Sequence, residues 1–128
     1  MLLLSTLLLS TSVFASAEIY CPDKIVFDHN GKSNVTAPFY IAFGPAVPKP
    51  YIEYIFYTAH FDGMPTCQYR ENPSNQNGDI LLYSQGVSLT ADFNYKNEPY
   101  GNKWYYVGAS GAWCDKGAQA SQCPWMKY

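Results

Sequence analysis

Apolar and polar residues alternate along parts of the chain after residue 17, with the period of two that is typical of β-strands. The clearest example is segment 87–95 (VSLTADFNY), whose odd positions are apolar and whose even positions are polar. Because successive side chains of a strand point to opposite faces, this segment is predicted to have one buried and one solvated face. Segment 51–61 (YIEYIFYTAHF) is apolar on both faces for most of its length, which predicts a central strand.

Short runs of this kind recur between clusters of Gly, Pro and Asn, and helical periodicity is hard to find. The pattern predicts strands at residues 24–28, 38–43, 51–61, 66–70, 79–84, 87–95 and 103–107. Tight turns that use positive φ are expected at Asp62-Gly63, Asn77-Gly78 and Gln85-Gly86. We therefore predict an all-β fold, either a small antiparallel β-sandwich or a partly open barrel.

The first 17 residues follow a different pattern. A mostly apolar run from Leu2 to Phe14 ends at Ala15-Ser16-Ala17, the small-x-small arrangement at which signal peptides are cleaved. The run is too short and too rich in Ser and Thr for a membrane span, and it lacks the usual basic residue near its start. We predict a signal peptide over residues 1–17 and a single β-rich domain over residues 18–128.

The predicted domain contains four cysteines: Cys21, Cys67, Cys114 and Cys123. An even number of cysteines in a small exported chain predicts two disulfides, and three pairings are possible. The close spacing of Cys114 and Cys123 favours that pair, which leaves Cys21 to bond with Cys67. No C-x-x-C pair is present and neither histidine lies near a cysteine, so a zinc site is not expected. The predicted location is secreted or periplasmic.

Charged residues do not indicate a polyanionic partner. Ten acidic and eight basic residues are scattered without a run of one sign, which argues against binding to nucleic acid or to an anionic membrane. The stretch Asp28-His29-Asn30-Gly31 lacks the spacing of a calcium loop and is predicted to be a polar turn. Asn34-Val35-Thr36 matches the N-glycosylation acceptor pattern.

A catalytic set is hard to find in this sequence. The motifs of nucleophile elbows, phosphate loops and zinc proteases are absent, and paired cysteines leave no thiolate. His60 precedes Asp62 by two positions, so both side chains would share one strand face and His60 is a candidate general base. A single histidine beside a turn aspartate is more often structural. We therefore expect a binding protein rather than an enzyme, with no cofactor and no metal.

Aromatic residues are unusually frequent: 12 Tyr, 7 Phe and 3 Trp make up 17% of the chain. They fill a thin β core, but a domain of this size cannot bury every phenol, so several rings are expected at the surface. Our candidate ligand-binding residues are Tyr95, Tyr100, Trp104, Tyr106 and Trp113. They predict a non-catalytic binding module for a glycan or a protein. The alternative is a secreted inhibitor or effector that docks to a host or competitor enzyme through loop 108–117.

Three short motifs carry a resemblance to a known family: Tyr20-Cys21-Pro22, Cys67-Gln68-Tyr69 and Cys123-Pro124-Trp125. The chain resembles a family of small exported bacterial proteins of unknown function, which implies bacterial export and no particular activity. A second comparison is with periplasmic lysozyme inhibitors, which insert a Ser-Gly-Ala loop into the enzyme's cleft. Ser110-Gly111-Ala112 is similar, but Trp113-Cys114 follows it in place of a basic and an aromatic residue, so the inhibitory residues are not carried over.

Overall fold

The computed structural model describes residues 18–74, 79–96, 100–109 and 111–128. The predicted signal peptide, the Asn77-Gly78 turn and Ser110 lie outside the described residues. No helix within these ranges is long and apolar enough to cross a membrane.

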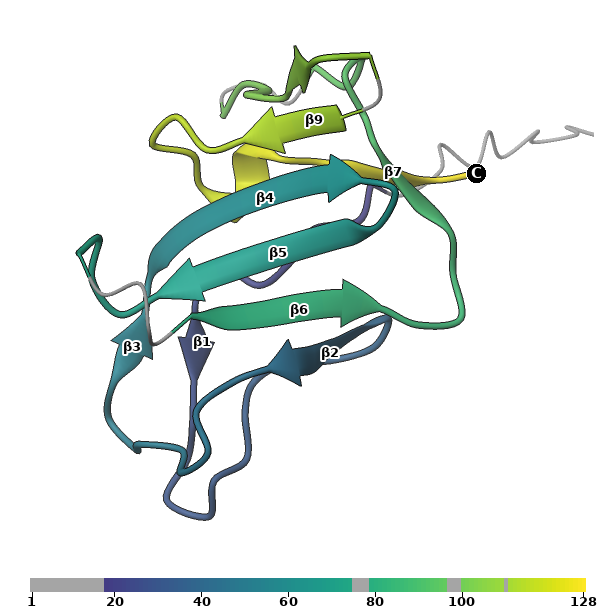
Figure 1. Ribbon diagram of the computed structural model, residues 1–128. Coiled ribbons are helices and arrows are strands. Elements are labelled where there is room, and N and C mark those ends of the chain that lie inside the picture. The colour runs from purple at the N-terminus through teal and green to yellow at the C-terminus, as the bar shows by residue number, and fades with distance from the viewer. Residues whose placement is uncertain (1–17, 75–78, 97–99, 110) are drawn as a thin grey trace, which may run out of the picture.

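Six antiparallel strands form the main sheet (Figure 1): β2 (Phe39–Phe43), β4 (Phe56–Asp62), β5 (Pro65–Arg70), β6 (Ile80–Ser84), β8 (Tyr105–Val107) and β9 (Gly111–Cys114). Their order across the sheet is β2-β6-β5-β4-β9-β8. Two short antiparallel pairs accompany the sheet, β1 (Ile25–Val26) with β3 (Glu53–Tyr54) and β7 (Leu89–Ala91) with β10 (Trp125–Lys127). A 3₁₀ turn, η2 (Ala120–Gln122), precedes β10. The predicted all-β antiparallel fold is confirmed.

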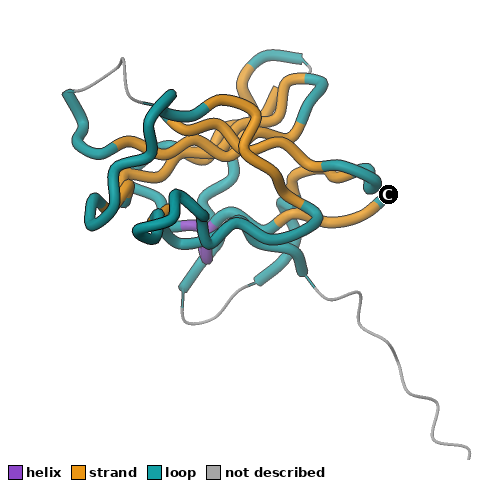
Figure 2. The backbone as a smooth tube through the Cα atoms, turned by 90° about the horizontal axis from the view of Figure 1, so that it is seen from below, coloured by secondary structure: helices purple, strands orange, loops and turns teal. Residues whose placement is uncertain are grey.

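One face of the main sheet is buried. Along one line across four neighbouring strands, the residues directly opposite one another are Leu82, Cys67, Ala59 and Cys114. Each is at most 1% exposed. Residue Ile19 bridges to Trp125 in β10, η2 contacts β4, and β7 contacts β5, so the N-terminal segment and the β7–β10 pair lie over this face. Figure 2 shows the strands of the main sheet on one side of the molecule and loops with η2 on the other.

Two disulfides attach this covering layer to the sheet. Cys21 in the N-terminal segment bonds Cys67 in β5, and Cys123 after η2 bonds Cys114 in β9. The pairing favoured by the cysteine spacing is therefore confirmed. Because Cys67 and Cys114 point to the same face, both ends of the domain are tied to that face and the opposite face stays open. Two structural disulfides are typical of proteins outside the reducing cytosol.

Several predicted strand boundaries were wrong. Segment 51–61 is not one strand, because Tyr51 has a φ of 70° and β3 and β4 are separate strands on either side of Ile55. In segment 87–95 only Leu89–Ala91 forms a strand, and Asp92 is buried although the alternation predicts that it is solvated. Loop 108–117 contains strand β9, and β10 was not predicted. Gly63 and Gly86 do adopt positive φ, at 73° and 75°, as expected for their turns.

Candidate binding face

The open face of the main sheet carries one continuous line of side chains that crosses all six strands. The residues directly opposite one another, from β2 to β8, are Tyr40, Tyr83, Thr66, His60, Trp113 and Tyr105. We call these six residues the cross-strand row. Paired residues of antiparallel strands point to the same face, so five aromatic or imidazole rings stand on one surface. In Figure 1 the covering segments run behind β4 and β5, and the viewer looks onto this open face.

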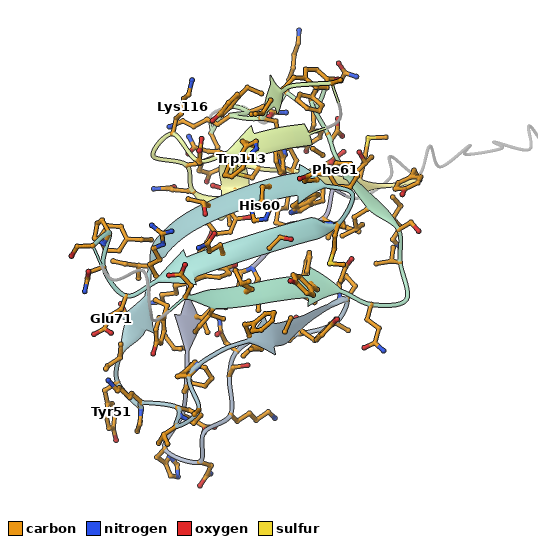
Figure 3. All side chains as sticks on the ribbon, in the orientation of Figure 1. Tyr51, His60, Phe61, Glu71, Trp113 and Lys116 are labelled. Atoms are coloured by element: carbon orange, nitrogen blue, oxygen red, sulfur yellow. A yellow bond between two sulfur atoms is a disulfide. The ribbon has the colours of Figure 1, made fainter. Side chains whose placement is uncertain are left out.

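Neighbouring rings are in contact in both halves of the row. His60 and Trp113 stack with their ring centroids 5.2 Å apart and their planes at 26°. Figure 3 labels both residues, on neighbouring strands β4 and β9. At the other end, the rings of Tyr40 and Tyr83 meet edge to face at 6.2 Å. Trp113 is 36% exposed and Tyr40 is 42% exposed, so the row is accessible from solvent.

The charged groups around the row are largely paired with neighbours. Nε of Arg70 lies 3.2 Å from a carboxylate oxygen of Asp79, which also accepts a hydrogen bond from Gln68. The Tyr105 hydroxyl donates to Asp115, and this hydrogen bond raises the pKa of Tyr105. The ammonium group of Lys116 lies 4.4 Å from the centre of the Tyr105 ring. The middle of the row therefore offers ring surface and neutral polar groups rather than a net positive field.

Trp104 does not belong to any exposed face. It is only 7% exposed, and its indole N–H donates to the carbonyl of Pro124 at 2.7 Å. Its ring packs edge to face against Trp125 at 4.8 Å. The sequence analysis expected Trp104 on a ligand-binding surface, whereas in the structure this residue fills the core under the C-terminal segment.

The other four candidate residues are spread over the surface. Tyr106 is 72% exposed and stacks on Phe93 at 4.0 Å, beside a cavity of about 390 Å³ that both residues line. Tyr100 lines a different cavity, of about 520 Å³, together with Tyr57. Tyr95 is exposed, and its backbone N–H bonds the carboxylate of Asp92. Of the five predicted residues, only Trp113 belongs to the cross-strand row.

Sequence reasoning missed Tyr40, Tyr83 and Tyr105 as members of a shared surface. It did single out His60, but for catalysis with Asp62. The charge of Asp62 affects the pKa of His60, but Nδ1 of His60 has no hydrogen-bond partner among the described residues. Burial lowers the pKa of His60 below its ordinary value of 6.5, against the opposing effect of Asp62. The imidazole is thus a neutral member of an aromatic row.

A pair of carboxyl groups also escaped the sequence analysis. Burial and a hydrogen bond with the Asp92 side chain raise the pKa of Glu18 to about 7. Asp92 itself is buried and accepts the backbone N–H groups of Asn94 and Tyr95, which makes it the organiser of the turn after β7. Residues 18 and 92 are far apart in sequence, so no local sequence pattern predicts that their carboxyl groups meet.

Two polar motifs near the N-terminus stabilise the local structure. Asp28 accepts the backbone N–H groups of Asn30 and Lys32, both at 2.9 Å, and these hydrogen bonds lower the pKa of Asp28. The stretch 28–31 is therefore the polar turn that was predicted. Asn34 of the glycosylation pattern bonds the backbone of β1 through its side chain. Among the described residues, no three His, Cys, Asp or Glu side chains form a group that would hold a metal ion.

Comparisons with known proteins add no relative to this picture. No family model, no curated protein and no solved structure matches the chain. The resemblance to small exported bacterial proteins stays a prediction.

Proposed function

We propose that this chain is an exported, non-catalytic binding module that holds a polysaccharide on the open face of its main sheet. The observation that carries the proposal is the cross-strand row, in which rings from five strands stand in register on the uncovered face. At a spacing of about 4.8 Å between strands, a row of six strands extends over about 24 Å. That length accommodates several consecutive sugar rings rather than a single small molecule.

The chemistry of the row favours a carbohydrate over a nucleic acid. Sugars present apolar C–H surfaces that pack on rings and hydroxyl groups that hydrogen-bond to polar tips, and Tyr and Trp offer both kinds of contact. Binding to a phosphate backbone requires several unpaired cations, whereas Arg70 and Lys116 beside the row are engaged with Asp79 and with the Tyr105 ring.

Retention on insoluble polysaccharides tests this proposal. Oxidised protein is incubated with cellulose, chitin and peptidoglycan, and the bound fraction is measured after sedimentation. We expect retention on at least one of them and a loss of affinity of about tenfold or more in Trp113→Ala, since a stacked aromatic contact contributes roughly 1–3 kcal/mol. Tyr51→Ala is the matched control, because Tyr51 is more exposed than Trp113 but lies outside the row and far from Trp113 (Figure 3).

Two results would contradict the proposal: no retention on any polysaccharide, or equal retention of Trp113→Ala and the wild type. The alternative, docking to an enzyme, was predicted to use loop 108–117. Part of that loop is strand β9, in the interior of the sheet order, and Trp113 is its exposed member. A stoichiometric enzyme partner whose binding depends on Trp113, in place of a polysaccharide, would favour that alternative.

A further inference from the structure

His60 occupies a central position in the cross-strand row. It lies opposite Thr66 of β5 on one side and Trp113 of β9 on the other. Thr66 is buried and its hydroxyl donates to the carbonyl of Met64, so it offers no free donor to a ligand. Trp113 presents a ring that already stacks on the imidazole. Between Thr66 and Trp113, His60 is therefore the residue with a polar group that is free to meet a ligand.

The two ring nitrogens of His60 are in different surroundings. Nδ1 is buried, and it has no hydrogen-bond partner in the part of the chain that the structure describes. His60 as a whole is only partly buried, and we infer that solvent reaches its ring through Nε2, which lies at the tip of the side chain. A buried N–H without an acceptor is rarer and more costly than a buried acceptor without a donor. The favoured neutral form carries its proton on Nε2, which becomes a donor on the open face.

The charges around His60 favour an uncharged ligand. On its own strand, the Asp62 side chain shares the open face and is exposed. The residues opposite His60, Thr66 and Trp113, and the diagonal Gln68 of β5 are uncharged. Asp115, which follows β9 on the same side, is an anion that accepts the Tyr105 hydroxyl. The cations Arg70 and Lys116 are engaged with Asp79 and with the Tyr105 ring. The carboxylate of a uronic or sialic acid would meet Asp62 and no free cation.

We propose that His60 determines the specificity of the cross-strand row, by donating a hydrogen bond from Nε2 to an oxygen of an uncharged saccharide that lies against Trp113. This inference rests on the proposed function, since it assigns a donor and a ligand class to the same face. His60 is a binding residue in this account and performs no proton transfer.

Binding of cellohexaose, chitohexaose and a hexauronate by calorimetry tests the inference. His60→Phe keeps an aromatic ring beside Trp113 but removes the donor, so we expect about tenfold weaker binding of the neutral hexasaccharide that the wild type binds. His29→Phe is the matched control, because His29 lies in the exposed turn after Asp28, and its affinity should equal that of the wild type. The wild type should bind the hexauronate more weakly than the neutral hexasaccharides. Asp62→Asn removes the negative charge beside His60, so the difference in affinity between the two kinds of ligand should become smaller.

Distinct outcomes separate this inference from the proposed function. If His60→Phe binds as tightly as the wild type while Trp113→Ala has lost binding, the role of His60 is overturned and the binding face stands. If Trp113→Ala retains full affinity, the binding face itself is overturned. The tautomer is measured independently by ¹⁵N NMR of the imidazole without any ligand. A proton found on Nδ1 at neutral pH would overturn the inference whatever the binding data show.

Discussion

Tyr51 has a backbone conformation that is unfavourable for any residue other than glycine. Its φ of 70° lies in the left-handed region, where a Cβ atom costs an L-residue roughly 1–2 kcal/mol. The side chain is 93% exposed, so little packing is lost when it is removed, and Figure 3 shows it far from His60 and Trp113. We expect Tyr51→Gly to be about 0.5–1 kcal/mol more stable than Tyr51→Ala, after allowance for the greater freedom of unfolded Gly. Urea denaturation of the two variants measures the difference, and a more stable Ala variant would contradict it.

His60 should make the stability of the protein depend on pH. Burial lowers its pKa in the folded state below the ordinary value of 6.5, so the unfolded chain binds the proton more readily. The contribution of His60 to the free energy of unfolding should therefore fall as the pH drops below about 6.5, until the folded-state pKa is passed. Glu18, whose folded-state pKa is raised to about 7, contributes in the opposite sense over the same range, so the contribution of His60 is read from the difference between variant and wild type. His60→Gln should flatten this part of the profile. Denaturation curves between pH 5 and pH 8 provide the measurement, and an unaltered profile in His60→Gln would refute the assignment.

At the level of elements, Asn34 connects the loop after the 28–31 turn to strand β1. Its side-chain amide donates to the carbonyl of Lys24 at 2.8 Å and accepts the N–H of Val26 at 3.0 Å. These bonds are partly open to solvent, so we expect Asn34→Ala to cost about 1 kcal/mol of unfolding free energy. Thr36→Ala is the control, since it removes the same glycosylation pattern but leaves both hydrogen bonds intact. Equal stability of the two variants in thermal melts would show that Asn34 does not stabilise β1.

The sequence patterns predicted where strands occur better than where they end. Alternation located β2, β5 and β6 to within a residue or two, because each has one inward and one outward side. It missed the break at Ile55, because β3 pairs with β1 whereas β4 pairs with β5 and β9, and the choice of partner is a long-range property. β9 and β10 contain four and three residues, which is too short for a period of two to be recognised.

The candidate site was harder to predict, for a related reason. Once Cys67 and Cys114 point inward to their disulfides, alternation places Thr66 and Trp113 on the outer face, and this much is readable from the sequence. That Trp113 stands beside His60, and Tyr40 beside Tyr83, depends on strand order and register. The burial of Trp104 could not be predicted from the sequence. Trp104 precedes β8, so the alternation of that strand does not say which way its side chain points. It is buried because the C-terminal segment packs over it.

At the level of the whole molecule, the two disulfides decide which face of the sheet is available. Cys67 and Cys114 lie on either side of Ala59 on the buried face, and each bonds to a different end of the domain. The covering layer is thus fixed to one face by two independent links. A ligand on the opposite face meets strands whose inner side is already packed, so the row should hold its geometry without rearrangement on binding.

The two links should contribute unequally to stability. The Cys21–Cys67 bond joins residues 46 positions apart, and the Cys114–Cys123 bond joins residues 9 apart. Chain-entropy arguments assign about 4 kcal/mol to the longer loop and about 2.5 kcal/mol to the shorter one. We expect Cys21→Ala/Cys67→Ala to unfold at a lower urea concentration than Cys114→Ala/Cys123→Ala. Similar midpoints, or the reverse order, would show that local packing around Trp113 and η2 outweighs the restriction of the unfolded chain. Because the row lies on the other face, either double variant that remains folded should retain the polysaccharide affinity of the wild type.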